Sequence, residues 1–228
     1  MDAGATLRKH LEHLKALRGE EAVAPGRLTE LKAFQAERLA RTYADLAAQP
    51  RYELATGFFL GDLYGPKDFS HRDTAMLRIL PLMVRTLPDK AVDTATLAIE
   101  LEALSESLDH RVAAALEPGR IDEERYARAY RAGSTRAERE RQIELIVEVG
   151  LRLDALVKKP LVHATLRVMR APARLAGLQD LQDFLERGFE SFQRMDGAAE
   201  FLALIRERET SILNRLFSGD PDPFSVSP

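Results

Sequence analysis

Apolar residues recur along most of this 228-residue chain at the three- and four-residue intervals of amphipathic helices. The ranges in which this spacing holds, each predicted to be a helix, are residues 5–18, 28–48, 51–64, 73–87, 89–116, 122–132, 135–157, 161–170, 178–195 and 198–217. Most prolines and many glycines fall where such a pattern starts or stops. No run of alternating apolar and polar residues marks a strand. We therefore expect an all-α fold, a single bundle of about eight to ten helices.

The segment over residues 51–64 is apolar on almost every side when it is placed on a helix. Tyr52 and Phe59 share one face, and Gly57 and Gly61 lie together on the opposite face. A helix that is apolar all round is normally buried among other helices. Two glycines lower helix propensity by roughly 1 kcal/mol each, so we expect another helix to approach closely along them. The segment is thus predicted to be a short buried central helix, with neighbours on both faces.

A tight corner is predicted to follow this segment. Gly65-Pro66 ends one helix, and Ser70 with Asp73 stands at capping-box spacing at the start of the next. The corner brings polar and aromatic side chains next to the apolar segment. The candidate ligand-binding residues are Glu53, Phe58, Phe59, Asp62, Tyr64, His71, Arg72 and Asp73.

Two interpretations of this corner stay open. In the first, Asp62 and Asp73 pair with Arg72 and fix the corner, because an unpaired buried polar group costs about 1–3 kcal/mol. In the second, Arg72 binds an anion in a small pocket and Tyr64 or His71 donates a proton. A guanidinium group suits carboxylate or phosphate, and imidazole titrates near neutral pH.

The stretch Phe58-Phe59-Leu60-Gly61-Asp62-Leu63-Tyr64 resembles the signature of an uncharacterised bacterial family whose motif is written Phe-Phe-Leu-Glu-Glu-Leu-Tyr. The following Arg72-Asp73 is similar to that family's continuation. The chain departs from the motif at Gly61, where the family has its first acid, while Asp62 keeps the second. The resemblance implies membership of that family, and it brings no activity, substrate or cofactor with it.

Composition narrows the classes of function. Thirty-three basic residues against 36 acidic ones give a net charge of −3, which lacks the basic excess of a nucleic-acid-binding protein. The chain has no cysteine, which excludes disulfides and thiolate chemistry. Its N-terminus lacks the apolar core of a signal peptide, and no run approaches about 18 uncharged apolar residues. We expect a cytoplasmic protein with no nucleic-acid and no membrane partner.

The domain organisation expected is one all-helical domain over residues 1–217. Residues 177–217 are a candidate C-terminal helical hairpin within it. Residues 218–228 contain three prolines, and this segment is predicted to be a disordered tail. Pro81, inside an apolar helix, predicts a kink because proline removes one backbone hydrogen bond.

Two groups of residues suggest a metal or ligand site. The first group combines carboxylate and histidine side chains, as metal sites in helical bundles do. Its members are Glu100, Glu102, Glu106, Asp109, His110, Glu144 and Glu148. Glu106 and His110, however, lie on the far side of their helix from its leucine stripe, so we predict an exposed charged face and no metal. The other is His163 with Arg167, and we interpret this histidine as a half-buried structural residue.

Motifs of common chemistries are missing from the sequence, among them a phosphate-binding glycine-rich loop and a Gly-x-Ser-x-Gly elbow. We therefore expect a non-enzymatic interaction or scaffold protein, with a homodimer as a candidate assembly. The alternative is a bundle whose internal pocket binds a small anionic ligand, a metal or a cofactor, with enzymatic activity left open. No particular cofactor is indicated.

Overall fold

The structure is a computed structural model that describes residues 3–19, 26–63, 70–86 and 88–225. Over these residues it consists of eleven α-helices and one π-helical turn, without a strand, so the predicted all-α class is confirmed. The first elements are α1 Ala3–Gly19, α2 Arg27–Thr42, α3 Ala44–Ala47, α4 Glu53–Phe58 and the π-helical turn η1 Phe59–Leu63. The later ones are α5 Ser70–Thr86, α6 Asp89–Ala115, α7 Glu123–Gly133, α8 Arg136–Val157, α9 Pro160–Leu175, α10 Gln179–Met195 and α11 Ala199–Ser218.

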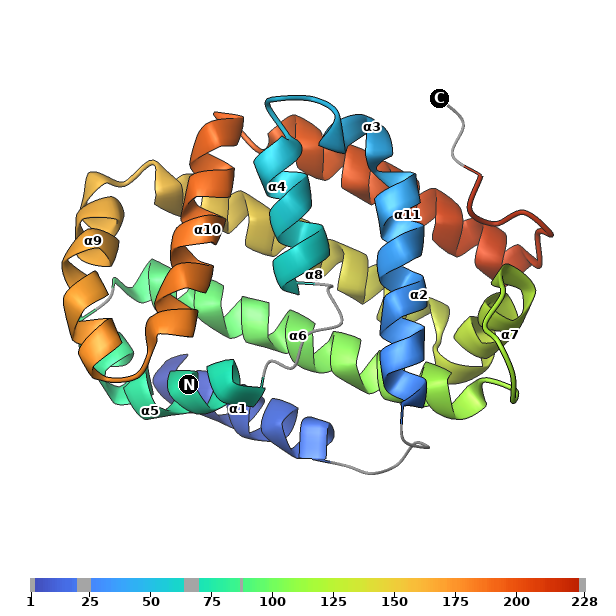
Figure 1. The fold of residues 1–228 in the computed structure, drawn as a ribbon, viewed down its shortest axis with the longest axis horizontal. Coiled ribbons are helices and arrows are strands. Elements are labelled where there is room, and N and C mark those ends of the chain that lie inside the picture. The colour runs from blue at the N-terminus through green and yellow to red at the C-terminus, as the bar shows by residue number, and fades with distance from the viewer. Residues whose placement is uncertain (1–2, 20–25, 64–69, 87, 226–228) are drawn as a thin grey trace.

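The long helix α6 is the centre of the molecule (Figure 1). It contacts α1, α2, α5, α7 and α8. Its buried residues include Ile99 and Val112, and also Glu106 and His110 on the side predicted to be exposed. The prediction of an exposed charged face is therefore wrong, because α1 and α2 cover the polar side of α6 as α8 covers the other.

The segment predicted to be the central helix is instead a short element with one buried side. Tyr52, Ala55 and Phe58 are buried, as expected for the aromatic face. A Cβ atom at Gly57 or Gly61 would meet no atom of the described residues within 4 Å, so the prediction of a close neighbour along the glycine face is wrong for this part of the chain. The reason is length, since α4 with η1 spans only a few turns and packs mainly on α10 and α3.

Close approach of helices occurs at other glycines. A Cβ atom at Gly133, the last residue of α7, would lie 2.6 Å from the backbone nitrogen of Val112 in α6. At Gly150 in α8, a Cβ would lie 2.5 Å from the side chain of Leu202 in α11. These positions, rather than the Gly57–Gly61 pair, are where a missing side chain lets two helices touch.

Apart from the 51–64 segment, which is α4 followed by η1, and α5, which begins at Ser70, the boundaries of the predicted helices agree with the structure except at two places. The range 28–48 is divided into α2 and α3 at Tyr43, whose backbone φ of −114° leaves the helical region. Helix α9 continues past residue 170, and Pro172 lies inside its last turn instead of marking a break. Pro81 lies inside α5, as the sequence indicates. None of the described helices is long and apolar enough to cross a bilayer.

The hydrophobic core has three parts. One lies around α7 and contains Tyr126, Tyr130 and Leu213, and a second lies between α4, α8, α10 and α11 and contains Phe192 and Phe201. The third joins α1, α5 and α6. The chain therefore buries apolar residues on both sides of α6 and again beneath α4.

The C-terminal part differs from the predicted hairpin and tail. Helix α10 packs against α9 and α4, whereas α11 packs along α8 in a different direction (Figure 1). Beyond α11, residues 220–225 lie against the bundle instead of forming the predicted disordered tail. Pro223 is buried, and the ring of Phe224 lies 5.8 Å from that of Tyr126, centroid to centroid.

Candidate functional site

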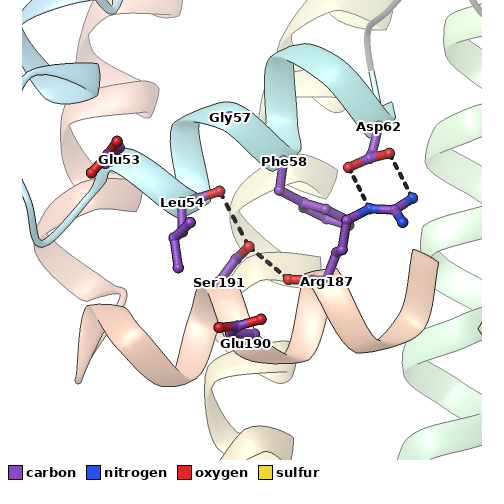
Figure 2. A pocket seen from close by; sticks show the side chains of 8 residues that line it. All are labelled: Glu53, Leu54, Gly57, Phe58, Asp62, Arg187, Glu190 and Ser191. Carbon is purple, nitrogen blue, oxygen red and sulfur yellow. Dashed lines mark hydrogen bonds and ion pairs between the residues drawn. The ribbon is translucent and has the colours of Figure 1, made fainter. Parts of the chain in front are cut away.

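An open pocket of about 360 Å³ lies between α4 with η1 on one side and α10 on the other. Figure 2 shows its lining side chains, which are Glu53, Leu54, Gly57, Phe58, Asp62, Arg187, Glu190 and Ser191. Three of the candidate residues from the sequence, Glu53, Phe58 and Asp62, are thus brought together at this pocket. The residues that α10 contributes were not predicted.

Asp62 and Arg187 form a two-pronged ion pair across the pocket (Figure 2). The guanidinium Nε and Nη2 atoms donate to the two carboxylate oxygens at 3.0 and 2.9 Å. The hydrogen bond to Asp62 raises the pKa of Arg187 above its ordinary value. Arginine and aspartate in this geometry position α10 against η1. The partner of Asp62 in this pair therefore comes from α10, 125 residues away in the sequence.

Packing below the pocket fixes the position of Phe58. Its ring lies 5.3 Å from that of Phe184, centroid to centroid, and 6.4 Å from that of Phe59. A Cβ atom at Gly188 would lie 2.9 Å from the Phe58 ring, so glycine at this place in α10 gives the ring its space. Phe59 faces the core instead of the pocket, and its ring packs against those of Phe192 and Phe201.

The chemistry of the pocket is limited by the partners of its polar groups. The Ser191 hydroxyl lies 3.2 Å from the carbonyl oxygen of Leu54 and 2.7 Å from that of Arg187. A serine nucleophile needs an adjacent base, and these two partners are backbone carbonyls. The described lining carries three carboxylates, from Glu53, Asp62 and Glu190, against the single guanidinium of Arg187. This charge does not favour a small anion.

The structure does not describe the side chains of the remaining predicted corner residues. Tyr64 and the side chains of His71, Arg72 and Asp73 lie outside the described residues. Both interpretations of the corner, as an ion-pair network or as an anion pocket, therefore remain predictions.

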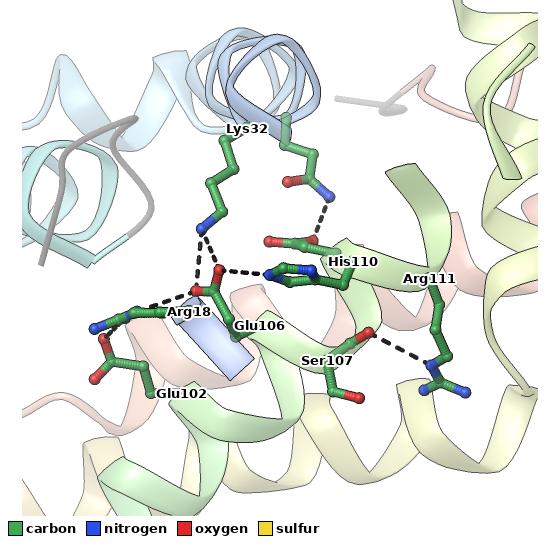
Figure 3. A network of polar contacts seen from close by, with 9 residues as sticks. Arg18, Lys32, Glu102, Glu106, Ser107, His110 and Arg111 are labelled. Atoms are coloured by element: carbon green, nitrogen blue, oxygen red, sulfur yellow. Dashed lines mark hydrogen bonds and ion pairs between the residues drawn. The ribbon is translucent and has the colours of Figure 1, made fainter. Parts of the chain in front are cut away.

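A second group of polar side chains links α1, α2 and α6 (Figure 3). The Lys32 ammonium donates to both carboxylate oxygens of Glu106, at 2.8 and 3.0 Å. Arg18 lies 3.4 Å from the same carboxylate and 2.5 Å from that of Glu102. Burial opposes the ionisation of Glu106, but the attraction of Lys32 and Arg18 outweighs it and lowers the pKa of the Glu106 carboxyl. This cluster holds three helices together.

His110 belongs to the same cluster, because its Nε2 atom lies 3.6 Å from Glu106 Oε1. Three other members of the predicted carboxylate–histidine group form separate ion pairs. Glu100 and Glu144 pair with Arg141, and Glu148 pairs with Arg152. Over the described part of the chain, no three His, Cys, Asp or Glu side chains come close enough to hold a metal ion.

A largely buried ion pair also connects α2 and α11. Arg38 Nη1 donates to Glu209 Oε1 at 2.7 Å, and the hydroxyl of Tyr43 donates to the same oxygen at 2.8 Å. Burial opposes the charge on Arg38, but the Glu209 carboxylate outweighs it, so the pKa of Arg38 is raised. A second open pocket, of about 410 Å³, lies beside this pair and is lined partly by Phe224 of the C-terminal segment.

His163 lies on the surface of α9 rather than half-buried. Its ring stacks on that of Phe189 in α10, with centroids 5.3 Å apart and planes 9° apart. The stacking supports a structural role for this histidine, since it attaches α9 to α10. Arg167, the other member of the predicted pair, is exposed.

The family model described as a domain of unknown function, DUF8198, matches residues 15–223. No match was found among curated proteins or among solved structures.

Proposed function

The chain belongs to the DUF8198 family, and we propose that it is a non-enzymatic interaction protein, a helical scaffold that presents helix α9 to a partner. The observation that carries this proposal is the exposure of large apolar side chains on α9. Leu161, Val168 and Leu175 have 68%, 74% and 90% of their surface exposed. Contiguous apolar residues on the surface of a folded protein mark interaction sites more often than isolated ones do.

The polar interior supports a structural rather than a catalytic role for its charged groups. Glu106 is bound by Lys32 and Arg18, and Glu209 is bound by Arg38 and Tyr43. Each group joins helices that are distant in the sequence. Catalytic acids and bases are instead placed where a substrate can reach them, in a cleft with a reacting group in hydrogen-bond range. The buried carboxylates of the described chain therefore act as links between helices.

The proposal includes the cell compartment and the origin of the protein. We infer a cytoplasmic location from the absence of cysteine in the sequence, which fits a reducing compartment. We also retain the resemblance of Phe58–Tyr64 to the Phe-Phe-Leu-Glu-Glu-Leu-Tyr family, with the bacterial origin that it implies. A homodimer is a candidate assembly, and no nucleic-acid partner is expected because the net charge is −3.

The alternative function is binding of a small ligand, a metal or a cofactor between α4 and α10. The pocket of about 360 Å³ and the aromatic ring of Phe58 in its lining favour it. The paired state of Asp62 and Arg187 counts against an anion, because such a ligand would have to displace a carboxylate from the guanidinium. This alternative ranks second.

Native mass spectrometry and metal analysis of the purified full chain separate the two functions. The interaction role predicts the mass of the chain alone, or of its assembly with another macromolecule, without a stoichiometric small species. A metal or an organic molecule bound at one per chain would contradict it. Loss of that species in an Asp62→Asn variant would assign it to the α4–α10 pocket.

A further inference from the structure

The exposed apolar residues of α9 form one narrow line. Leu161, Val168 and Leu175 are seven residues apart, and Ala164 and Ala171 stand three residues after the first two. Alternating intervals of three and four residues are those of the a and d positions in a coiled coil. All five residues are exposed. We call this line the α9 seam.

The opposite side of α9 is the one that attaches it to the bundle. Ala173 is buried there, and His163 stacks on Phe189. Arg170 donates to the two carboxylate oxygens of Glu186 in α10, at 2.6 and 2.7 Å. Figure 1 shows α9 at one end of the molecule, beside α10. The seam therefore points outward from a helix that is already folded and held in place.

The charges beside the seam all have one sign. Arg167 and Arg174 directly precede Val168 and Leu175, which is the g position of a heptad. In the described part of the chain neither of them has an ion-pair partner, whereas Arg170 does. No acidic residue occurs between Asp154 and Asp180. In a chain with a net charge of −3, this segment is a local concentration of positive charge.

We infer that the α9 seam binds a helix of another protein whose own apolar seam is flanked by aspartate or glutamate. We choose an acidic partner because its carboxylates would complement the arginines beside the α9 seam. Charged side chains on either side of an apolar seam determine which helices pair. The inference rests on the proposed function, that the chain acts by binding through α9. It adds the chemical class of the partner.

Two other occupants fit the seam less well. A second copy of the chain would bring the same two arginines and no carboxylate on α9. The arginines beside the two seams would then repel each other, and no ion pair could form between the two α9 helices. A lipid surface suits a helix with a broad apolar face and bulky residues. Two of the five seam residues are alanine, and a line restricted to the a and d positions is the narrow pattern of helix pairing.

The test uses two synthetic peptides of about three heptads, with leucine at a and alanine at d. One peptide has glutamate at its flanking positions and the other has lysine. Each is labelled and titrated with the full chain, and binding is followed by fluorescence anisotropy. We expect the glutamate peptide to bind, and the lysine peptide to bind at least tenfold more weakly.

Variants of the chain test separately the apolar contact of the α9 seam and the charge beside it. Val168→Ser should weaken binding of the glutamate peptide about tenfold or more, because it removes the central apolar contact. The double variant Arg167→Glu/Arg174→Glu should reverse the preference and bind the lysine peptide. The matched controls are Leu151→Ser on α8, where leucine is 47% exposed, and Arg120→Glu/Arg206→Glu at two exposed arginines. Both controls should bind as the unchanged chain does, and all variants should keep its melting temperature.

Several outcomes would overturn the inference. Equal binding of both peptides, or binding of neither, excludes an acidic helix as the partner. Flotation of the chain with phosphatidylglycerol-containing vesicles, lost in Val168→Ser, would assign the seam to a lipid surface. Concentration-dependent self-association in sedimentation velocity, lost in the same variant, would assign it to a second copy. Either result leaves the interaction role standing, whereas a stoichiometric small ligand at the α4–α10 pocket contradicts the proposed function itself.

Discussion

The Cβ atom that Gly133 lacks would lie 2.6 Å from the backbone nitrogen of Val112. At this point α7 and α6 touch through their backbones, and a methyl group has no flexible side chain to push aside. Gly57 is the opposite case, because a Cβ there would meet open space. The two glycines differ in what they do although both lie in helices.

Gly133→Ala should therefore lower the free energy of unfolding by about 2–3 kcal/mol, since overpacking at a rigid contact forces the helices apart. Gly57→Ala, the matched control, should leave it unchanged or raise it by up to about 1 kcal/mol, because alanine favours the helix. Urea denaturation followed by circular dichroism measures both. Equal effects of the two substitutions would show that α7 and α6 can separate freely at Gly133.

Glu138 predicts a pH dependence of stability. Its carboxylate accepts hydrogen bonds from Arg111, at 2.7 Å, and from the backbone N–H of Thr135, at 2.8 Å. Chiefly the Arg111 bond lowers the pKa of Glu138 from 4.5 to about 2. A carboxyl whose pKa is lower in the folded state stabilises the protein above its unfolded pKa. That contribution is lost as the pH falls from about 4.5 towards about 2.

Glu138→Gln removes this charge, and the stability of the variant should vary less with pH over that window. At neutral pH the variant should be less stable by about 1 kcal/mol, a figure reduced for the solvent exposure of the side chain. Urea midpoints at several pH values from 2 to 7 measure the difference. Glu140→Gln, at an exposed ion pair with Arg136, is the control and should change little. An unchanged pH profile for Glu138→Gln would show that the cap contributes nothing through its charge.

The cluster at Glu106 predicts a cost for leaving buried charges unpaired. Glu106→Leu leaves Lys32 without the carboxylate that it binds and removes one carboxylate partner of Arg18, and we expect a loss of about 3 kcal/mol in the free energy of unfolding. Adding Lys32→Met to that variant should recover part of the loss, because an apolar pair replaces the lone ammonium. Glu144→Gln, whose side chain is 66% exposed in its pair with Arg141, should cost about 0.5 kcal/mol or less. Additive losses for Lys32→Met and Glu106→Leu would show that the two side chains do not interact.

The sequence predicted the helices well because their signals are local. Apolar spacing located the helices, and the capping box of Thr135 and Glu138 is formed as the spacing indicates. The burial of Glu106 could not be predicted in this way. Periodicity identifies the apolar face of a helix, but it does not say how many neighbours the helix has. The neighbours here are Lys32 and Arg18, which are 74 and 88 residues away.

The candidate site was predicted in part for the same reason. Glu53, Phe58 and Asp62 lie on one short segment, so their proximity follows from the chain itself. Arg187 and Ser191 come from α10, and nothing in the spacing of that helix distinguishes them from its other polar residues. The prediction made from the Gly57–Gly61 pair is wrong because the low helix propensity of these glycines is not offset by a close neighbour in the described chain. A short helix at the edge of a bundle has too few neighbours to bury both of its faces.

Asp109 predicts the opposite pH behaviour to Glu138. Burial raises the pKa of its carboxyl above the ordinary value of 3.8, against the hydrogen bond that Oδ1 accepts from Gln35 at 2.9 Å. In the unfolded chain the group ionises first as the pH rises, so an ionised Asp109 destabilises the fold above about 3.8.

Asp109→Asn keeps an oxygen for Gln35 and removes the charge. The variant should be more stable than the unchanged chain at neutral pH, and the difference should disappear in acid, where Asp109 is protonated in both states. Thermal melting at several pH values between 3 and 7 measures this, with Asp93→Asn at an exposed position of α6 as the control. A lower melting temperature for Asp109→Asn at neutral pH would show that the attraction of Lys32 and Arg139 for the carboxylate outweighs its burial. In that case Asp109 would belong with Glu106 among the charges that hold α6 in the centre of the bundle.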